Sequence, residues 1–93
     1  MNYERSYLNT RNFEGRTLTV TYAVVETCNI YAKAELSSVF SLACAMYDGQ
    51  GEVESAFVYD VTREKERAKE LAELLCREFV TPNTMRYVIE DML

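Results

Sequence analysis

The side chains that could do chemistry in this sequence are a few carboxylates: Asp48, Asp60 and the adjacent pair Glu90 and Asp91. Two carboxylates can share acid–base catalysis when their surroundings hold their pKa values apart. Because Glu90 and Asp91 are neighbours, on a helix their side chains diverge by about 100° and cannot act on one substrate. Glu90 is better placed for an exposed ion pair with Arg86, one helical turn earlier. We therefore predict no catalytic residue and no enzyme activity.

The residue types that bind metals or form disulfides are sparse. The sequence has no histidine, and its three cysteines, Cys28, Cys44 and Cys76, are far apart. Zinc sites use closely spaced ligands, and a disulfide framework uses an even number of cysteines. We expect Cys44 and Cys76 to be reduced core residues, whereas Cys28 lies near a turn and could be exposed. With no glycine-rich phosphate loop either, we predict no metal site and no cofactor.

Charge and length restrict the partners and the organisation of the chain. Fifteen acidic and ten basic residues are mixed along it and leave a net charge of −5, with no basic stripe for nucleic acid or an anionic membrane. No apolar run approaches the ~20 residues that cross a bilayer, and the N-terminus lacks a signal-peptide core, so we expect a cytoplasmic protein. Its 93 residues, 48% of them hydrophobic, predict a single domain over residues 1–93.

Three segments alternate between apolar and other residues with the period of a β-strand, at about 16–27, 39–48 and 52–61. The sequence Asp-Gly-Gln-Gly at residues 48–51 is typical of a hairpin turn between the last two. The residues predicted to face the core are Leu18, Val20, Tyr22 and Val24, then Phe40, Leu42, Cys44 and Met46, then Val53, Ser55, Phe57, Tyr59 and Val61. Residues 1–15 fit an N-terminal arm or a short strand. Residues 28–38 fit a strand, a helical turn or a loop.

Two helices are expected after the strands. The first spans about 62–80, with Thr62 as its N-cap, an apolar stripe on one side and charged residues on the other. The second spans about 82–92, with Thr81 as N-cap and Pro82 at the first helical position. The predicted fold is therefore α+β: a three- or four-stranded antiparallel sheet with both C-terminal helices packed on one face.

The main functional question raised by the sequence concerns the apolar stripe of the second helix. Met85, Val88, Ile89 and Met92 recur at helical spacing, and so short a helix must dock on something. The stripe fits either core packing, which we favour, or a protein-binding surface. The residues of the possible interaction surface are Met85, Val88, Ile89, Met92, Tyr47 and Tyr59.

These observations favour a protein–protein interaction or regulatory module, with an unidentified protein or a second copy of the chain as partner. The alternative is a small-molecule sensor, because seven tyrosines could line an apolar pocket in a small sheet. An enzyme ranks below both.

The end of the chain also resembles a known family. Residues 81–93 are similar to the terminal segment SP-x-H-L-x-x-V-V/I-E-D-F-L of short proteins from clostridia and related Firmicutes, a family classed as a domain of unknown function. Residues 48–75 are similar to it in layout. There are two departures, since Thr84 stands where the family has histidine, and residues 28–38 resemble an insertion. The resemblance implies an α+β fold and a bacterial cytoplasmic protein, and implies no activity.

Overall fold

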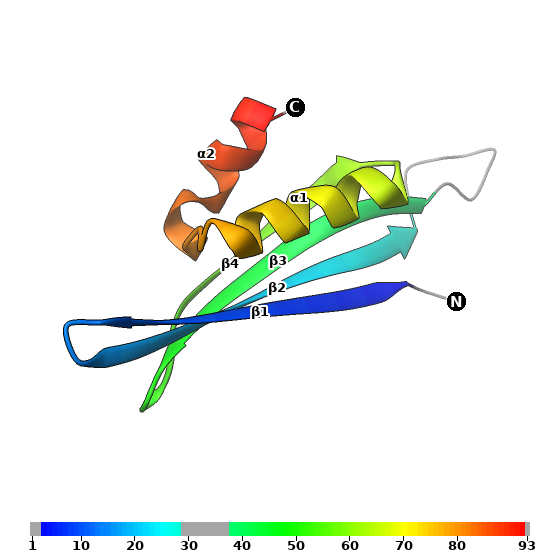
Figure 1. Cartoon of the computed structure of the whole chain (residues 1–93). Helices are drawn as coiled ribbons and strands as arrows, with labels where there is room; N and C mark the ends of the chain where they lie inside the picture. The colour runs from blue at the N-terminus through cyan, green and yellow to red at the C-terminus, as the bar shows by residue number, and fades with distance from the viewer. Residues whose placement is uncertain (1–2, 29–37, 93) are drawn as a thin grey trace.

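The chain forms a four-stranded sheet followed by two helices (Figure 1). The computed structural model describes residues 3–28 and 38–92. The elements are β1 (Glu4–Phe13), β2 (Arg16–Cys28), β3 (Ser38–Asp48), β4 (Gly51–Thr62), α1 (Lys65–Arg77) and α2 (Pro82–Met92). The strands are antiparallel in the order β1-β2-β3-β4, and both helices lie on the same face of the sheet. The predicted α+β fold is confirmed, with four strands. Whether residues 28–38 form a strand, a helical turn or a loop stays open, because residues 29–37 lie outside the described residues.

The first strand corrects the alternative of an N-terminal arm. β1 pairs with β2 along its whole length, from Glu4 opposite Val25 to Phe13 opposite Arg16. The two residues between the strands, Glu14 and Gly15, have positive φ of 50° and 82°. Positive φ at both central residues is the geometry of the two-residue hairpin turn that suits twisted strands. The N-terminal residues are therefore an edge strand, and a longer one than the sequence suggested.

The core lies between the sheet and the helices. The predicted inward residues of the two central strands are buried at Val20, Tyr22, Val24, Phe40, Leu42 and Cys44. They pack against Ala68, Leu71, Ala72 and Leu75 of α1 and against Met85 and Ile89 of α2. The hydroxyl of Tyr22 donates a 2.8 Å hydrogen bond to the carbonyl oxygen of Val80, in the segment joining the helices. This bond satisfies the one polar group that Tyr22 brings into the core.

The facing of β4 is opposite to the prediction over most of its length. Val53, Phe57 and Tyr59 are exposed, as is Ser55, and only Val61 of the predicted inward set is buried. The cause is a β-bulge near the end of the strand, where Leu42 pairs with Val58 but Phe40 pairs with Thr62. Asp60 lies in the bulge with a φ of 54°. A bulge adds residues to one strand and exchanges its two faces, so alternation extrapolated from Val61 assigns the wrong side.

The first helix is shorter than predicted at both ends. Its N-cap is Glu64 and not Thr62; Thr62 ends β4, and its Oγ1 accepts a 3.1 Å hydrogen bond from the Glu64 N–H. At the other end Phe79 has a φ of 53°, and the N–H groups of Phe79 and Val80 donate to the carbonyls of Cys76 and Leu75. This is the Schellman ending, in which a left-handed residue closes the last turn. Phe79 stands where glycine is usual, so no residue before Pro82 signals the end of the helix.

The second helix spans the predicted residues. Thr81 precedes it and Pro82 opens it, as expected, but the Thr81 hydroxyl bonds the side chains of Asn83 and Thr84. The Thr81 carbonyl accepts the Thr84 N–H at 3.1 Å, which closes the first turn. The guanidinium of Arg67 donates a 2.8 Å hydrogen bond to the Met92 carbonyl and ties the end of α2 to α1.

Candidate functional site

The apolar stripe of α2 belongs mainly to the core. Met85 and Ile89 are buried and pack against the sheet, and Val88 is half-buried against the same cluster. Met92 is exposed at 38%, beyond the edge of that cluster. Because an inaccessible side chain cannot bind a partner without unfolding, Met85 and Ile89 do not form an interaction surface.

The other face of the sheet is the surface that the described elements leave uncovered. We call it the open face and define it by cross-strand rows, since paired residues share a face. One row is Ser6, Ala23, Ala43 and Phe57; the next is Leu8, Thr21, Ala45 and Ser55; a third is Thr10, Thr19, Tyr47 and Glu52. Tyr59 follows Phe57 on β4. All these residues point away from the buried cluster, because their neighbours along each strand point into it.

A shallow hollow lies in the middle of the open face. Its volume is about 450 Å³, and it is lined chiefly by Thr21, Ala23, Ala43, Ala45, Ser55 and Phe57. Alanine, serine and threonine side chains are too short to fill the space above the strands, whereas the Phe57 ring stands at the rim and is 50% exposed. A surface of matching shape can pack closely against this face, with one group in the hollow and another against the ring.

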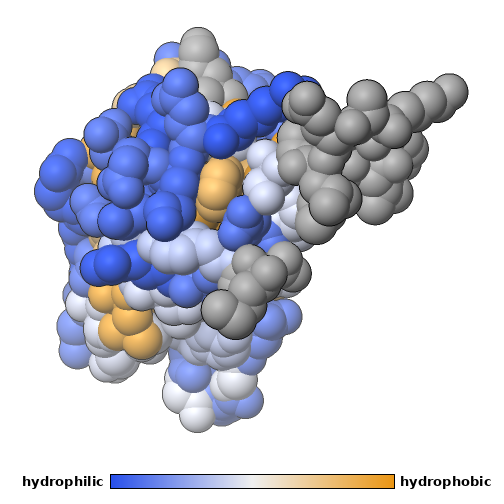
Figure 2. Space-filling view, turned by 90° about the vertical axis from the view of Figure 1, so that its right-hand side faces the viewer, coloured by the Kyte–Doolittle hydropathy of each residue, from blue (hydrophilic) through white to orange (hydrophobic). Residues whose placement is uncertain are grey.

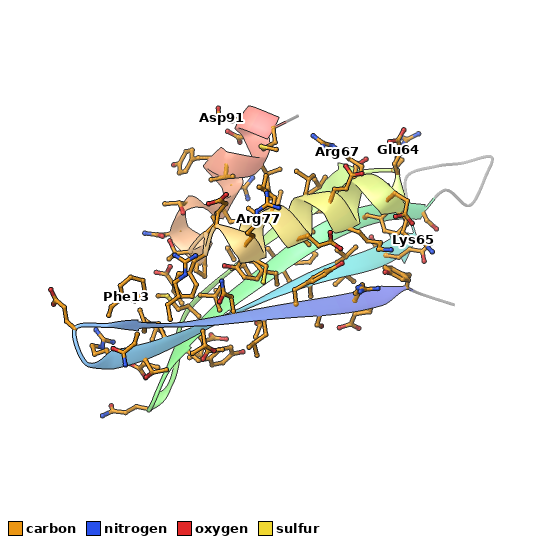
Figure 3. All side chains as sticks on the ribbon, viewed as in Figure 1. Phe13, Glu64, Lys65, Arg67, Arg77 and Asp91 are labelled. Carbon is orange, nitrogen blue, oxygen red and sulfur yellow. The ribbon has the colours of Figure 1, made fainter. Side chains whose placement is uncertain are left out.

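The open face also differs in charge from the helix layer. The two rows around the hollow hold no charged residue, and the third row has one, Glu52 on β4. The helices carry the ion pairs Arg67–Glu70 and Lys69–Glu66 and expose further charges. In Figure 2 hydrophilic residues cover most of the upper part, where the helices lie, and a hydrophobic patch reaches the surface in the lower part. Figure 3 shows Glu64 and Arg67 pointing away from the sheet. The helix layer therefore presents more charged groups to water than the open face does.

Tyr47 and Tyr59, the two sheet residues of the predicted interaction surface, are exposed at 36% and 44%. The structure places both on the open face, away from Met85, Val88, Ile89 and Met92, so the six residues do not form one surface. Two exposed residues of this face, Leu8 and Phe57, were missed. Leu8 lay in the segment with an uncertain strand, and Phe57 had been assigned to the core. A second register shift, between Glu52 and Glu54, means that alternation followed from the hairpin turn also places Phe57 in the core.

The opposite face of β1 is held by the helix layer. The Tyr7 hydroxyl donates to Glu73 at 3.3 Å, and the Asn9 side-chain amide donates to the Cys76 carbonyl at 2.7 Å. Near the turn, the Phe13 ring lies 5.7 Å from the Phe79 ring. Figure 3 labels Phe13. These contacts bind the edge strand to α1 and leave only its other face free.

The candidate carboxylates lie on different elements, Asp48 on β3, Asp60 on β4, and Glu90 and Asp91 on α2. Asp48 forms a 3.2 Å ion pair with Arg16 and accepts the Gln50 N–H, which fixes the hairpin turn. Glu90 and Asp91 are exposed, and the described residues show no ion pair between Glu90 and Arg86. No group of three cysteine or carboxylate side chains that could hold a metal gathers within residues 3–28 and 38–92.

The two described cysteine side chains are free thiols. Cys44 is buried as predicted, and burial raises its pKa to about 12. Cys76 is half-buried and packs against the core cluster, and burial also raises its pKa. A thiol with a raised pKa is a poor nucleophile at neutral pH, since the thiolate is the reactive form. No helix in the described part of the chain is long and apolar enough to cross a membrane.

A family model described as "Family of unknown function (DUF6514)" matches residues 1–93. No curated protein and no solved structure matches the chain. The resemblance to a family of unknown function is confirmed at that level, while its clostridial source and its terminal motif stay expectations.

Proposed function

We propose that this chain, which belongs to the DUF6514 family of unknown function, is a protein-binding module that uses the open face of its sheet. The observation that supports this role is a face whose two central rows are uncharged, in a chain of which 27% of residues are charged. An antiparallel sheet that faces only water usually carries polar and charged residues outward. Here the outward positions hold Ala23, Ala43 and Ala45 with exposed Phe57 and Leu8.

The composition of the open face fits protein binding because interface cores are depleted in charge and enriched in aromatic residues. Phe57, Tyr59 and Tyr47 supply aromatic area along one side of the hollow. The serine and threonine hydroxyls of the face supply hydrogen-bonding groups with little side-chain entropy to lose. The free thiols of Cys44 and Cys76 agree with a reducing compartment, so we place this role in the bacterial cytoplasm.

A small-molecule sensor, the alternative from the sequence, has weaker support. The hollow is within the volume range of ligand sites, but such sites bury most of the ligand and bring a few polar groups together. This hollow is open on one side and lined by alanines and short hydroxyl side chains. A thermal-shift screen in which metabolites raise the melting temperature would favour the sensor.

The binding role can be tested by photo-crosslinking in the cells that make the protein. A photoreactive phenylalanine analogue replaces Phe57, at the centre of the open face, and in a matched variant it replaces Tyr87, which is 67% exposed on α2. We expect a discrete protein adduct from position 57 and none from position 87. The absence of an adduct at position 57, with both variants folded, would refute a binding role for the open face.

A further inference from the structure

We infer that the partner of the open face is a second copy of this chain, docked sheet against sheet about a two-fold axis. This inference rests on the proposed function, since it names the occupant of the same surface. A two-fold interface uses the same patch on both copies, so the patch must complement itself in shape and in charge. The open face meets both requirements.

The shape argument comes from the Phe57 ring and the hollow beside it. Ala43 and Ala23 share the cross-strand row of Phe57 and lie one and two strands away from it, respectively. A two-fold axis running along β3, in the plane between two stacked sheets, exchanges β4 of one copy with β2 of the other. Each Phe57 ring then lies over the partner's Ala23, inside the hollow that Thr21, Ala23 and Ala43 line. A ring that protrudes from each face thus fills the space that the small residues leave on the other.

The charge argument follows from the net charge of −5. Two copies repel each other through most orientations, because like charges that face each other across an interface are costly. The two rows around the hollow carry no charge. The axis along β3 sets Glu52 of the third row over the partner copy's Thr19, so two open faces can meet without bringing like charges together. The helix layer, with its exposed acidic residues, cannot pair with itself in this way.

The area available suits a weak dimer. With the axis along β3, three strands of each copy overlap, over the seven residues of β3 between buried Ser41 and the hairpin turn. Strands about 4.8 Å apart and about seven residues long give a flat footprint of roughly 350 Å² on each copy. The two copies together then bury about 700 Å², which is below the usual size of a stable interface and suits a transient contact. We expect a dissociation constant of about 100 µM.

Sedimentation equilibrium of the purified chain, from about 1 to 500 µM, tests this inference. Phe57→Glu places a charge in the hollow of the partner, and Tyr87→Glu makes the same change at an exposed aromatic residue outside the open face. We expect a concentration-dependent dimer for the natural chain and for Tyr87→Glu. Removal of a central aromatic anchor typically weakens an interface by about 30-fold or more, so Phe57→Glu should remain a monomer. Circular dichroism confirms that each variant is folded.

A natural chain that is monomeric at every concentration overturns the inference. A dimer that persists in Phe57→Glu, or that is lost equally in Tyr87→Glu, overturns it as well, because the contact then lies elsewhere. The proposed function fails separately, through the crosslinking experiment. A monomeric protein whose position 57 crosslinks to a different protein keeps the binding role and loses the second copy as its partner. A dimer whose adduct at position 57 has twice the mass of the chain supports both.

Discussion

The substitution of Met85 by alanine should destabilise the fold far more than the same substitution at Met92. Both methionines lie in the apolar stripe of α2, seven residues apart. Met85 is fully buried against the sheet, whereas Met92 is 38% exposed. Removing a buried methionine side chain costs about 2–5 kcal/mol, because its transfer free energy is lost and a cavity is left. At Met92 we expect a cost of about 1 kcal/mol or less, since water fills the space.

The magnitude matters because a chain of 93 residues has a free energy of unfolding of roughly 5–14 kcal/mol. Met85→Ala therefore removes a large part of the stability and lowers the melting temperature by about 10 °C or more. Urea unfolding followed by circular dichroism measures both variants, and Met85→Leu, which restores the volume, should recover most of the loss. Costs that agree within about 0.5 kcal/mol at the two positions would refute the placement of α2 as a core element.

Three further predictions concern polar and ionisable groups. Ser41→Ala should lower the free energy of unfolding by about 1–3 kcal/mol, because the buried Ser41 hydroxyl accepts a hydrogen bond from the Asp60 N–H in the bulge. In urea unfolding, the control Ser55→Ala, at an exposed position, should change this free energy by about 0.5 kcal/mol or less. The melting temperature should fall between about pH 9 and 12, because burial raises the pKa of Cys44 to about 12 and also raises that of Tyr22. Folding favours the neutral forms of both groups, so their contribution to the free energy of unfolding is complete below the unfolded pKa values and is lost as the pH rises above them. The melting temperature of Cys44→Ala should therefore fall less over this pH range than that of the natural chain. The Cys44 thiol should react with a disulfide reagent no faster than the protein unfolds, and fast labelling of this site at pH 8 would contradict its burial.

The sequence predicted the elements whose periodicity is uninterrupted. Val20, Tyr22 and Val24 alternate through β2, and the spacing of α2 is regular, so hydrophobic burial alone determines which side faces the core. β1 was harder to assign because its inward positions include Asn9 and Arg11. Their polar groups donate to the backbone carbonyls of Cys76 and Arg77. A strand that packs through side-chain hydrogen bonds has no apolar alternation to detect.

The candidate site could be predicted only in part, because it depends on the bulge in β4. No single residue type signals that Asp60 adopts a positive φ, although aspartate tolerates this region better than most residues. Alternation read back from Val61 placed Phe57 in the core, and only the pairing register with β3 reverses that assignment. Tyr47 and Tyr59 were identified as surface aromatics, but the rows that join them to the alanines of β2 and β3 require the sheet order.

The edges of the sheet explain why association should use the face and not the strand ends. An exposed edge strand offers unpaired backbone groups that promote uncontrolled pairing, and proteins block it with bulges and charges. β4 has a bulge at Asp60, and β1 carries Arg5 and Arg11. The Arg11 guanidinium lies 5.0 Å from the centre of the Phe79 ring, and this contact keeps its charge next to β1. With both edges blocked and charge concentrated on the helices, the open face around Phe57 is the remaining surface on which two copies can meet without a like-charge clash. Asp60→Val, which extends a flat apolar edge, should therefore promote higher oligomers in sedimentation velocity; a size distribution that stays unchanged would show that the bulge has no such protective role.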